Sequence, residues 1–223
     1  MAFRRGSGKG LGLGVLALLA LLLPRLALAC TLVVLGDSLT AGFGLKPEDS
    51  FPSQLARALE ERGLRCRVIN AGVSGDTSAG GLARIDWVLA ERPTHLLLEL
   101  GANDGLRGLP TDRLEANLDA IIRRARERGV RVFLTGMYAP PNWGEAYGAA
   151  FAEVYRRLAA RYRLPFYPFF LEGVFGKPEL MQADGLHPNA QGVREIVRRL
   201  APLVAAWLAG EREAELVQPG VPD

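Results

Sequence analysis

The stretch "LVVLGDSLTAG", residues 32–42, joins an uninterrupted apolar run to a turn of small and polar residues. Apolar runs without polar alternation are typical of strands that are buried on both faces of a parallel sheet. The Asp37-Ser38 pair that follows has two interpretations. The pair can cap a helix by accepting hydrogen bonds from free backbone N–H groups. Alternatively, Ser38 is a nucleophile held at the carboxyl end of the strand.

Apolar runs alternate with amphipathic helical patterns along the rest of the chain. The predicted strands are residues 31–35, 66–70, 95–100, 130–135 and, more weakly, 165–170. The predicted helices are residues 50–62, 81–91, 112–128, 145–162 and 189–208, and Pro202 is expected to bend the last one. This alternation predicts an α/β fold: a single-domain, three-layer α/β/α sandwich around a parallel sheet. Such sheets bind ligands beyond the carboxyl ends of their strands.

The first 29 residues have the pattern of a secretory signal peptide. Basic residues precede an apolar run from residue 11 to 23, and Ala27 and Ala29 form a small-residue cleavage site. The run is short for a membrane span, although an uncleaved N-terminal anchor is the alternative. We therefore expect residues 30–209 to form the exported, periplasmic domain, without a stable membrane span once the signal is cleaved. The polar tail, 210–223, is expected to be disordered.

The basic character of the chain belongs to this leader. Removing residues 1–29 takes away four basic residues and no acidic one, so the formal net charge changes from +3 to −1. The remaining domain shows no basic run of the kind that binds nucleic acid, so no nucleic-acid partner is expected.

Unusual polar residues follow the predicted strands at one edge of the sheet. Ser38 follows the first strand, Gly72 and Gly75 follow the second in "NAGVSGDTSAG", and Asn103 follows the third in "GANDGLRGLP". The loop "DGLHPN", with Asp184 and His187, precedes the last helix. Taken singly, each of these residues is explained as well by a turn or a cap. Their convergence at one edge favours a site.

A serine nucleophile needs a base, and the chain contains two histidines. His95 begins the third predicted strand, at the opposite end from the site, so we interpret it as structural. His187 is then the candidate base, and the carboxylate of Asp184 is placed to accept from its Nδ1 and to leave Nε2 facing Ser38. The N–H groups of Ser38 and Gly75 and the side-chain amide of Asn103 are the candidate oxyanion donors.

These four blocks resemble those of the SGNH hydrolases, also called the GDSL esterase/lipase family. The matching residues are 36–39 (GDSL), Gly75 in "SGDTS", 101–104 (GAND) and 184–188 (DGLHP). Within the family, "GANDGLRGLP", "PFF" and "MQADGLHPN" are similar to its bacterial thioesterase and lysophospholipase members. The resemblance covers residues 31–208. It implies a flavodoxin-like five-stranded sheet and serine-dependent hydrolysis of acyl thioesters and esters, of the acyl-CoA thioesterase, lysophospholipase or arylesterase type.

The resemblance also implies an acyl groove. The family uses the segment after the asparagine, here residues 104–110, as a mobile loop over the acyl chain, with Leu106 and Leu109 as its apolar members. Met137, Tyr138 and Trp143 are expected to form another wall, unless these residues only pack the rim. The partner is therefore a small acyl ester or thioester, with no cofactor and no metal ion, and the chain is expected to be a monomer. A carbohydrate deacetylase is the alternative on the same machinery, and a non-catalytic binding module is the alternative of another class.

The chain has two cysteines, Cys30 and Cys66. In the strand order 2-1-3-4-5 of a flavodoxin-like sheet, they lie at the same end of neighbouring strands, within the reach of a disulfide. An oxidising periplasm permits the bond. Lipid attachment at Cys30, the first residue after the predicted cleavage, and two free thiols are the alternatives.

Overall fold

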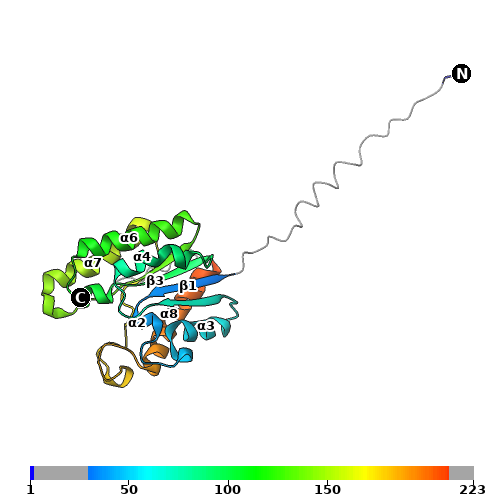
Figure 1. The fold of residues 1–223 in the computed structure, drawn as a ribbon. Helices are drawn as coiled ribbons and strands as arrows, with labels where there is room; N and C mark the ends of the chain where they lie inside the picture. The colour runs from blue at the N-terminus through cyan, green and yellow to red at the C-terminus, as the bar shows by residue number, and fades with distance from the viewer. Residues whose placement is uncertain (3–29, 211–223) are drawn as a thin grey trace.

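The computed structural model describes residues 1–2 and 30–210. The predicted signal peptide, 1–29, and the predicted tail, 210–223, therefore lie almost wholly outside the described residues. The described chain forms a five-stranded parallel sheet in the order β2-β1-β3-β4-β5 (Figure 1). Its strands are β1 (Thr31–Gly36), β2 (Arg67–Gly72), β3 (His95–Glu99), β4 (Arg131–Thr135) and β5 (Phe166–Tyr167).

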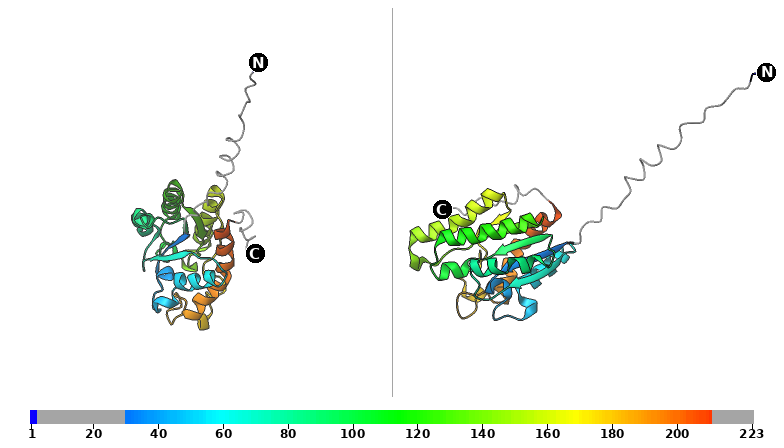
Figure 2. Two further views of the ribbon diagram at one scale, coloured as in Figure 1. Left: turned by 90° about the vertical axis from the view of Figure 1, so that its right-hand side faces the viewer. Right: turned by 45° about the horizontal axis from the view of Figure 1, so that its top comes forward.

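Helices cover both faces of this sheet, as Figures 1 and 2 show. On one face lie α4 (Ser78–Leu89), α6 (Thr111–Glu127) and α7 (Glu145–Tyr162), and on the other lie α3 (Phe51–Glu60) and α8 (Ala190–Ala209). The predicted three-layer, single-domain α/β/α sandwich is confirmed.

The strand order reverses direction beside β1. The chain leaves β1 toward β2 on one side of the sheet, and β3 begins on the other side of β1. Loops that leave neighbouring strands in opposite directions open a binding crevice at the carboxyl edge. The short helices α2 (Ser38–Ala41) and α5 (Ala102–Leu106) begin at this edge, directly after β1 and β3. The candidate site residues Ser38 and Asn103 lie on these two helices.

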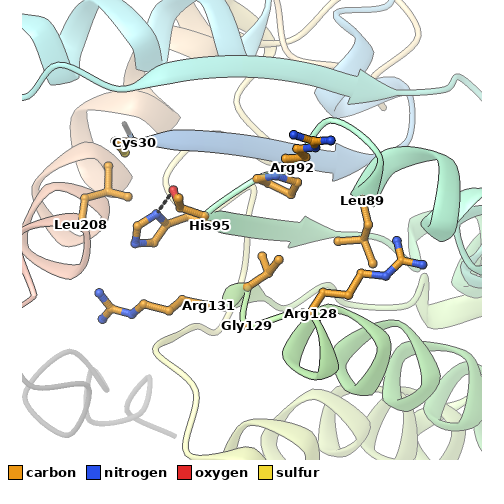
Figure 3. A pocket seen from close by; sticks show the side chains of 11 residues that line it. Cys30, Leu89, Arg92, His95, Arg128, Gly129, Arg131 and Leu208 are labelled. Atoms are coloured by element: carbon orange, nitrogen blue, oxygen red, sulfur yellow. Dashed lines mark hydrogen bonds between the residues drawn. The ribbon is translucent and has the colours of Figure 1, made fainter. Parts of the chain in front are cut away.

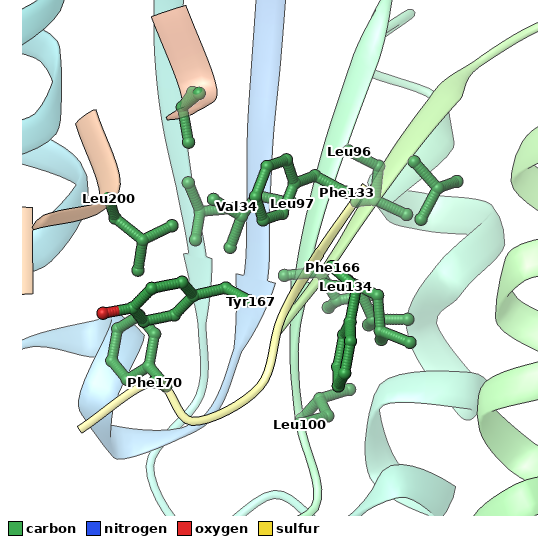
Figure 4. Close-up of a cluster of buried hydrophobic side chains, with 14 of the residues drawn as sticks. Val34, Leu96, Leu97, Leu100, Phe133, Leu134, Phe166, Tyr167, Phe170 and Leu200 are labelled. Carbon is green, nitrogen blue, oxygen red and sulfur yellow. The ribbon is translucent and has the colours of Figure 1, made fainter. Parts of the chain in front are cut away.

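The core is built from the central strands and the apolar faces of the helices (Figure 4). The side chains of residues 32–35 in β1 and 96–98 in β3 are fully buried, which explains their uninterrupted apolar pattern. The second strand differs from the prediction, because β2 forms the edge of the sheet and its residues are exposed or only half buried.

The remaining differences are at element boundaries. Helix α4 begins three residues before the predicted start, because Thr77 caps it and accepts a hydrogen bond from the Gly80 N–H (3.3 Å). Helix α8 begins and ends one residue later than predicted and contains Pro202 on its exposed side. Strand β5 is reduced to two residues. Three 3₁₀ turns complete the fold: η1 (Pro47–Asp49), η2 (Pro141–Trp143) and η3 (Pro178–Leu180).

A disulfide joins Cys30 and Cys66, whose Cα atoms lie 4.6 Å apart. The bond lies at the amino ends of β1 and β2, where the Arg67 N–H also donates to the Cys30 carbonyl (2.9 Å). Of the three sequence alternatives, the structure contains the bridge, which ties the edge strand β2 to the central strand β1.

Candidate active site

The turn after β1 satisfies both interpretations of the Asp37-Ser38 pair. Asp37 caps α2, because its Oδ1 accepts a hydrogen bond from the Leu39 N–H (3.0 Å). Ser38 is the first residue of this short helix and is only partly buried. Capping by the aspartate thus leaves the neighbouring serine hydroxyl directed away from the helix backbone and available to a partner.

That partner is His187. The Ser38 Oγ lies 2.9 Å from His187 Nε2, and His187 Nδ1 lies 2.6 Å from Asp184 Oδ2. Because an ionised carboxylate only accepts hydrogen bonds, Nδ1 donates to Asp184 and Nε2 is left to accept from the serine hydroxyl. The three side chains therefore form one hydrogen-bonded series from carboxylate to imidazole to hydroxyl.

The loop that carries Asp184 and His187 is held in a defined conformation. Asp184 Oδ1 accepts from the backbone N–H groups of Leu186 (2.9 Å) and His187 (3.0 Å). The backbone and side-chain hydrogen bonds from His187 lower the pKa of Asp184 to about 2, so this carboxyl is ionised at neutral pH. The base of the loop is closed by an antiparallel bridge between Met181 and Pro188 and by the Gln182 N–H, which donates to the His187 carbonyl (2.8 Å).

The other two candidate oxyanion donors, Gly75 and Asn103, lie on the β2–α4 loop and on helix α5. Gly75 has φ +85°, a conformation that favours glycine, in the loop between β2 and α4. Asn103 lies on α5, and its Nδ2 donates to the Asp76 carbonyl (2.9 Å) and to Asp37 Oδ2 (3.2 Å). Asn103 thus links Asp76, the residue after Gly75, to Asp37, the residue before Ser38.

Sequence reasoning missed Asp104, which fixes α5. Its buried carboxylate accepts from the N–H (2.7 Å) and the hydroxyl (2.6 Å) of Ser78, and Asn117 donates to the same hydroxyl (2.9 Å). These bonds anchor α5 against the first turn of α4 and so orient Asn103. The signal in the sequence was an acidic residue directly after the asparagine, between small residues.

Arg84 was also missed, because an arginine within an amphipathic helix is usually solvated. Its guanidinium donates to Asp76 Oδ2 (2.7 Å) and to the carbonyls of Ala71 (2.8 Å) and Gly36 (2.9 Å). The side chain is mostly buried, and it ties the Gly75 loop to the carboxyl ends of β1 and β2. No pattern in the chain distinguishes this arginine from the others.

The predicted groove residues divide into two groups. The side chains of Leu106 and Tyr138 are 43% and 40% exposed near the carboxyl edge, Trp143 is exposed, and Leu109 is partly buried. Met137 differs from the prediction, because only 4% of it is exposed and it packs in the core beneath this rim. The segment predicted as a mobile loop begins within helix α5 and ends where the Tyr147 hydroxyl donates to the Leu109 carbonyl (2.7 Å).

His95 lies at the opposite end of the sheet, as predicted, and lines a cavity of about 610 Å³ there (Figure 3). Burial, together with the nearby Arg131 guanidinium, lowers the pKa of His95 to about 4. The imidazole is therefore neutral at pH 7, and its Nδ1 lies 2.8 Å from the Thr94 hydroxyl. This cavity contains none of the residues that converge on Ser38, so we treat it as separate from the site.

Between residues 30 and 210, no helix is both long and apolar enough to cross a membrane. Within the same part of the chain, no three His, Cys, Asp or Glu side chains are grouped so that they could hold a metal ion.

A parallel α/β sheet with serine, histidine and carboxylate joined in series at its carboxyl edge defines a hydrolytic enzyme of the serine type. Comparison with known proteins identifies the family within this class. The chain belongs to the GDSL-like lipase/acylhydrolase family, whose model matches residues 34–195. The predicted resemblance is confirmed, and the chain is an ester hydrolase of the SGNH type.

Known sequences and solved structures align with most of the length of this chain. The esterase TesA of Pseudomonas aeruginosa is 47% identical over 87% of this chain and 96% of its own length. Thioesterase 1/protease 1/lysophospholipase L1 of Escherichia coli K12 is 38% identical over 86% of this chain and 87% of its own. The structure of the psychrotrophic esterase EstA from Pseudoalteromonas, inhibited by monoethylphosphonate, superposes with a TM-score of 0.77 at 35% identity, covering 81% of this chain and 99% of that one.

Proposed function

We propose that this chain is an exported serine hydrolase that cleaves acyl thioesters and carboxylic esters, with Ser38 as nucleophile, His187 as base and Asp184 as orienting acid. The observation that carries the proposal is the unbroken series of hydrogen bonds from Asp184 Oδ2 through both imidazole nitrogens to Ser38 Oγ. A serine hydroxyl is a weak nucleophile until a base removes its proton, and this geometry supplies the base.

The reaction proceeds through an acyl-enzyme. His187 Nε2 takes the hydroxyl proton while Ser38 Oγ attacks the carbonyl carbon, and the carbonyl π electrons move to the oxygen. Collapse of the tetrahedral intermediate expels the alcohol or thiol, which receives the proton from His187, and leaves an ester on Ser38. A water molecule then attacks this ester with His187 again as base, releasing the carboxylic acid and restoring the hydroxyl.

Asp184 contributes by remaining ionised. Its pKa of about 2 keeps a negative charge 2.6 Å from Nδ1, where it stabilises the imidazolium that forms in each step. The backbone N–H groups on Oδ1 hold the carboxylate in place, so the imidazole keeps the tautomer that accepts from Ser38.

The oxyanion is stabilised by the N–H groups of Ser38 and Gly75 and by the Asn103 amide. Both hydrogens of Asn103 Nδ2 already have acceptors, Asp76 O at 2.9 Å and Asp37 Oδ2 at 3.2 Å. The bond to Asp37 is the longer one, so it is the one that Asn103 shares with the developing oxyanion. Donors fixed in this way act mainly in the transition state.

The substrate class follows from the rim of the site. Phe43 packs against the His187 ring (4.6 Å between centroids), and Phe43, Leu106, Tyr138 and Leu186 are exposed although apolar. Apolar surface beside a polar reaction centre suits an acyl chain. The related esterase and the thioesterase/lysophospholipase support esters and thioesters as substrates, and we expect the enzyme to act as a periplasmic monomer without a cofactor.

A phosphonate ester tests the proposal. The wild-type protein is expected to lose activity with a p-nitrophenyl ester and to gain one phosphonyl group, located at Ser38 by peptide mass mapping. Ser38→Ala is expected to retain the fold, to remain unlabelled and to lose more than about a thousandfold in kcat. Ser53→Ala is the matched control and is expected to keep the wild-type activity and labelling, because Ser53 is a half-buried serine of α3 whose hydroxyl donates to the Pro47 carbonyl (2.8 Å). Labelling of another residue, or a Ser38→Ala variant with a tenth of the wild-type kcat, would contradict the proposal.

A further inference from the structure

Glu99 is a buried acid that the proposed mechanism does not use. It is the last residue of β3, it pairs in register with Gly36 of β1, and its side chain is completely buried. Its carboxyl reaches across to the turn of the nucleophile, where Oε2 accepts a hydrogen bond from the Thr40 hydroxyl (2.7 Å). Thr40 lies on α2, two residues after Ser38, so this bond joins β3 directly to the helix that begins at the nucleophile.

The contact also explains the glycine at position 36. A Cβ atom on Gly36 would collide with the Glu99 carboxyl and the Thr40 hydroxyl, because both fill the space that a side chain would take. The Glu99–Thr40 pair is therefore packed against the backbone of the turn. The position of Ser38 relative to the sheet depends on this contact as well as on the path of β1.

The surroundings of Glu99 favour a neutral carboxylic acid. Burial is the main cause that raises the pKa of Glu99 well above its usual value, and the neighbouring Asp37 raises it further. The backbone N–H groups of Asp37 and Thr40 act in the opposite direction but do not offset burial. Among the described residues, no hydrogen-bond partner reaches Glu99 Oε1.

The other ionisable groups nearby do not alter this conclusion. Burial raises the pKa of Asp37 to about 6; nearby His187 lowers this pKa and nearby Asp104 raises it. Glu99 in turn contributes to the raised pKa of Tyr155 on α7. The groups that shift the pKa of Glu99 include no cationic side chain. A buried carboxyl without a cation is far more stable when protonated.

We propose that Glu99 is a positioning residue: as a neutral carboxyl bonded to Thr40 and packed on Gly36, it fixes α2 so that Ser38 stays within hydrogen-bond distance of His187. This inference rests on the proposed role of Ser38 as nucleophile. In this role Glu99 contributes its shape and its hydrogen bond to Thr40, but no charge.

Two substitutions separate these contributions. Glu99→Gln keeps the size, the neutral charge and one carbonyl oxygen that can face Thr40, and it places its NH₂ where Oε1 has no partner. Glu99→Leu keeps approximate size and burial but removes the oxygen. Thr40→Val removes the same hydrogen bond from the other side with little change in shape. Thr135→Val is the matched control, because Thr135 is buried in β4 and donates to the Leu98 carbonyl (3.2 Å), away from the turn.

The measurements are kcat and KM with a p-nitrophenyl ester, the rate of phosphonate labelling at Ser38, and urea unfolding. Glu99→Gln is expected to stay within about threefold of the wild-type kcat between pH 6 and 9. Glu99→Leu and Thr40→Val are expected to lose at least about tenfold in kcat and in labelling rate, with KM within about twofold. Thr135→Val is expected to change only the unfolding midpoint.

The proposal is overturned if folded Glu99→Leu or Thr40→Val keeps kcat within twofold of wild type. It is also overturned if Glu99→Gln loses as much as Glu99→Leu, because a charge would then be required. If Glu99→Leu does not fold, Thr40→Val takes its place in both comparisons. Failure of the wild-type protein to be labelled at Ser38 is a different result, which contradicts the proposed function and not the role of Glu99.

Discussion

Replacing Arg84 by methionine is expected to weaken both the fold and the catalytic rate. Methionine keeps most of the apolar length of the side chain but removes all donors. The three acceptors that Arg84 serves, Asp76 Oδ2 and the carbonyls of Ala71 and Gly36, then lose a partner at the edge of the sheet where the site is assembled.

The size of the effect follows from burial. The side chains of Arg84 and Asp76 are each 18% exposed, so water replaces the lost donors only in part. Breaking a buried ion pair from one side costs about 3–5 kcal/mol, and we expect the lower end, about 3 kcal/mol, because Asp76 retains some access to solvent. With a urea dependence of about 2 kcal/mol per molar for a domain of this size, the midpoint falls by about 1.5 M.

The catalytic effect has an upper bound. Loss of one oxyanion donor costs on the order of 10²–10³ in kcat, and the proposed donor beside the Asp76–Arg84 pair is the Gly75 N–H. Asn103 still binds the Asp76 carbonyl, so the loop keeps one anchor and the expected loss is about tenfold, with little change in KM. Arg84→Lys reaches fewer acceptors than arginine and should give an intermediate loss.

Urea unfolding and steady-state kinetics on the same preparations check both values. Arg124→Met is the control, because the Arg124–Asp86 pair (3.1 Å) is roughly half exposed and should contribute at most about 1 kcal/mol. An Arg84→Met protein with an unchanged midpoint would refute the stability reasoning. An Arg84→Met protein that unfolds at a lower urea concentration but retains the wild-type kcat would show that the ion pair does not hold the proposed Gly75 donor in place.

Three further predictions concern other parts of the molecule. Asn103→Ala should lower kcat by about 10²-fold or more and change KM little, whereas a change confined to KM would make Asn103 a substrate-positioning residue. Replacing Cys30 and Cys66 by serine removes a bridge that closes 37 residues (a separation of 36 plus one) and should cost about 3–4 kcal/mol in urea unfolding; equal midpoints would contradict this. The lowered pKa of His95 favours the neutral imidazole in the folded state, so stability is lost as pH falls from about 6.5 toward 4. Between pH 6.5 and 4, the free energy of unfolding of His95→Phe should therefore fall by about 3 kcal/mol less than that of the wild type. Parallel curves of unfolding free energy against pH for the two proteins would contradict this prediction.

The central part of the fold could be predicted from the sequence because burial leaves a direct pattern. The uninterrupted apolar runs of β1 and β3 reflect strands covered on both faces, and their spacing by amphipathic helices implies parallel pairing. The edge position of β2 could not be predicted from its composition, because Val68, Ile69 and Ala71 are apolar although only half buried. Strand order comes from the resemblance and from tertiary packing, not from local composition.

The candidate site divides in the same way. Ser38, Asp184 and His187 could be proposed because their residue types are chemically specific and their loops follow or precede recognisable elements. Glu99 and Arg84 could not, since both lie within regular elements where a single polar residue has many structural explanations. Met137 was misplaced because the sequence shows that a residue lies near the rim but not which side of the backbone it occupies.

Ser38 and His187, the proposed nucleophile and base, are separated by 149 residues along the chain. Their contact can form only after most of the sheet has assembled, since Ser38 follows the first strand and His187 lies beyond the last. The segment that carries His187 lies outside the sheet and is held at its base by the bridge between Met181 and Pro188 and by local hydrogen bonds such as that from the Gln182 N–H to the His187 carbonyl (2.8 Å), so its opening requires less free energy than unfolding of the sheet. Recovery of esterase activity should thus be the slowest signal during refolding, and heat should abolish it before circular dichroism records any loss of helix.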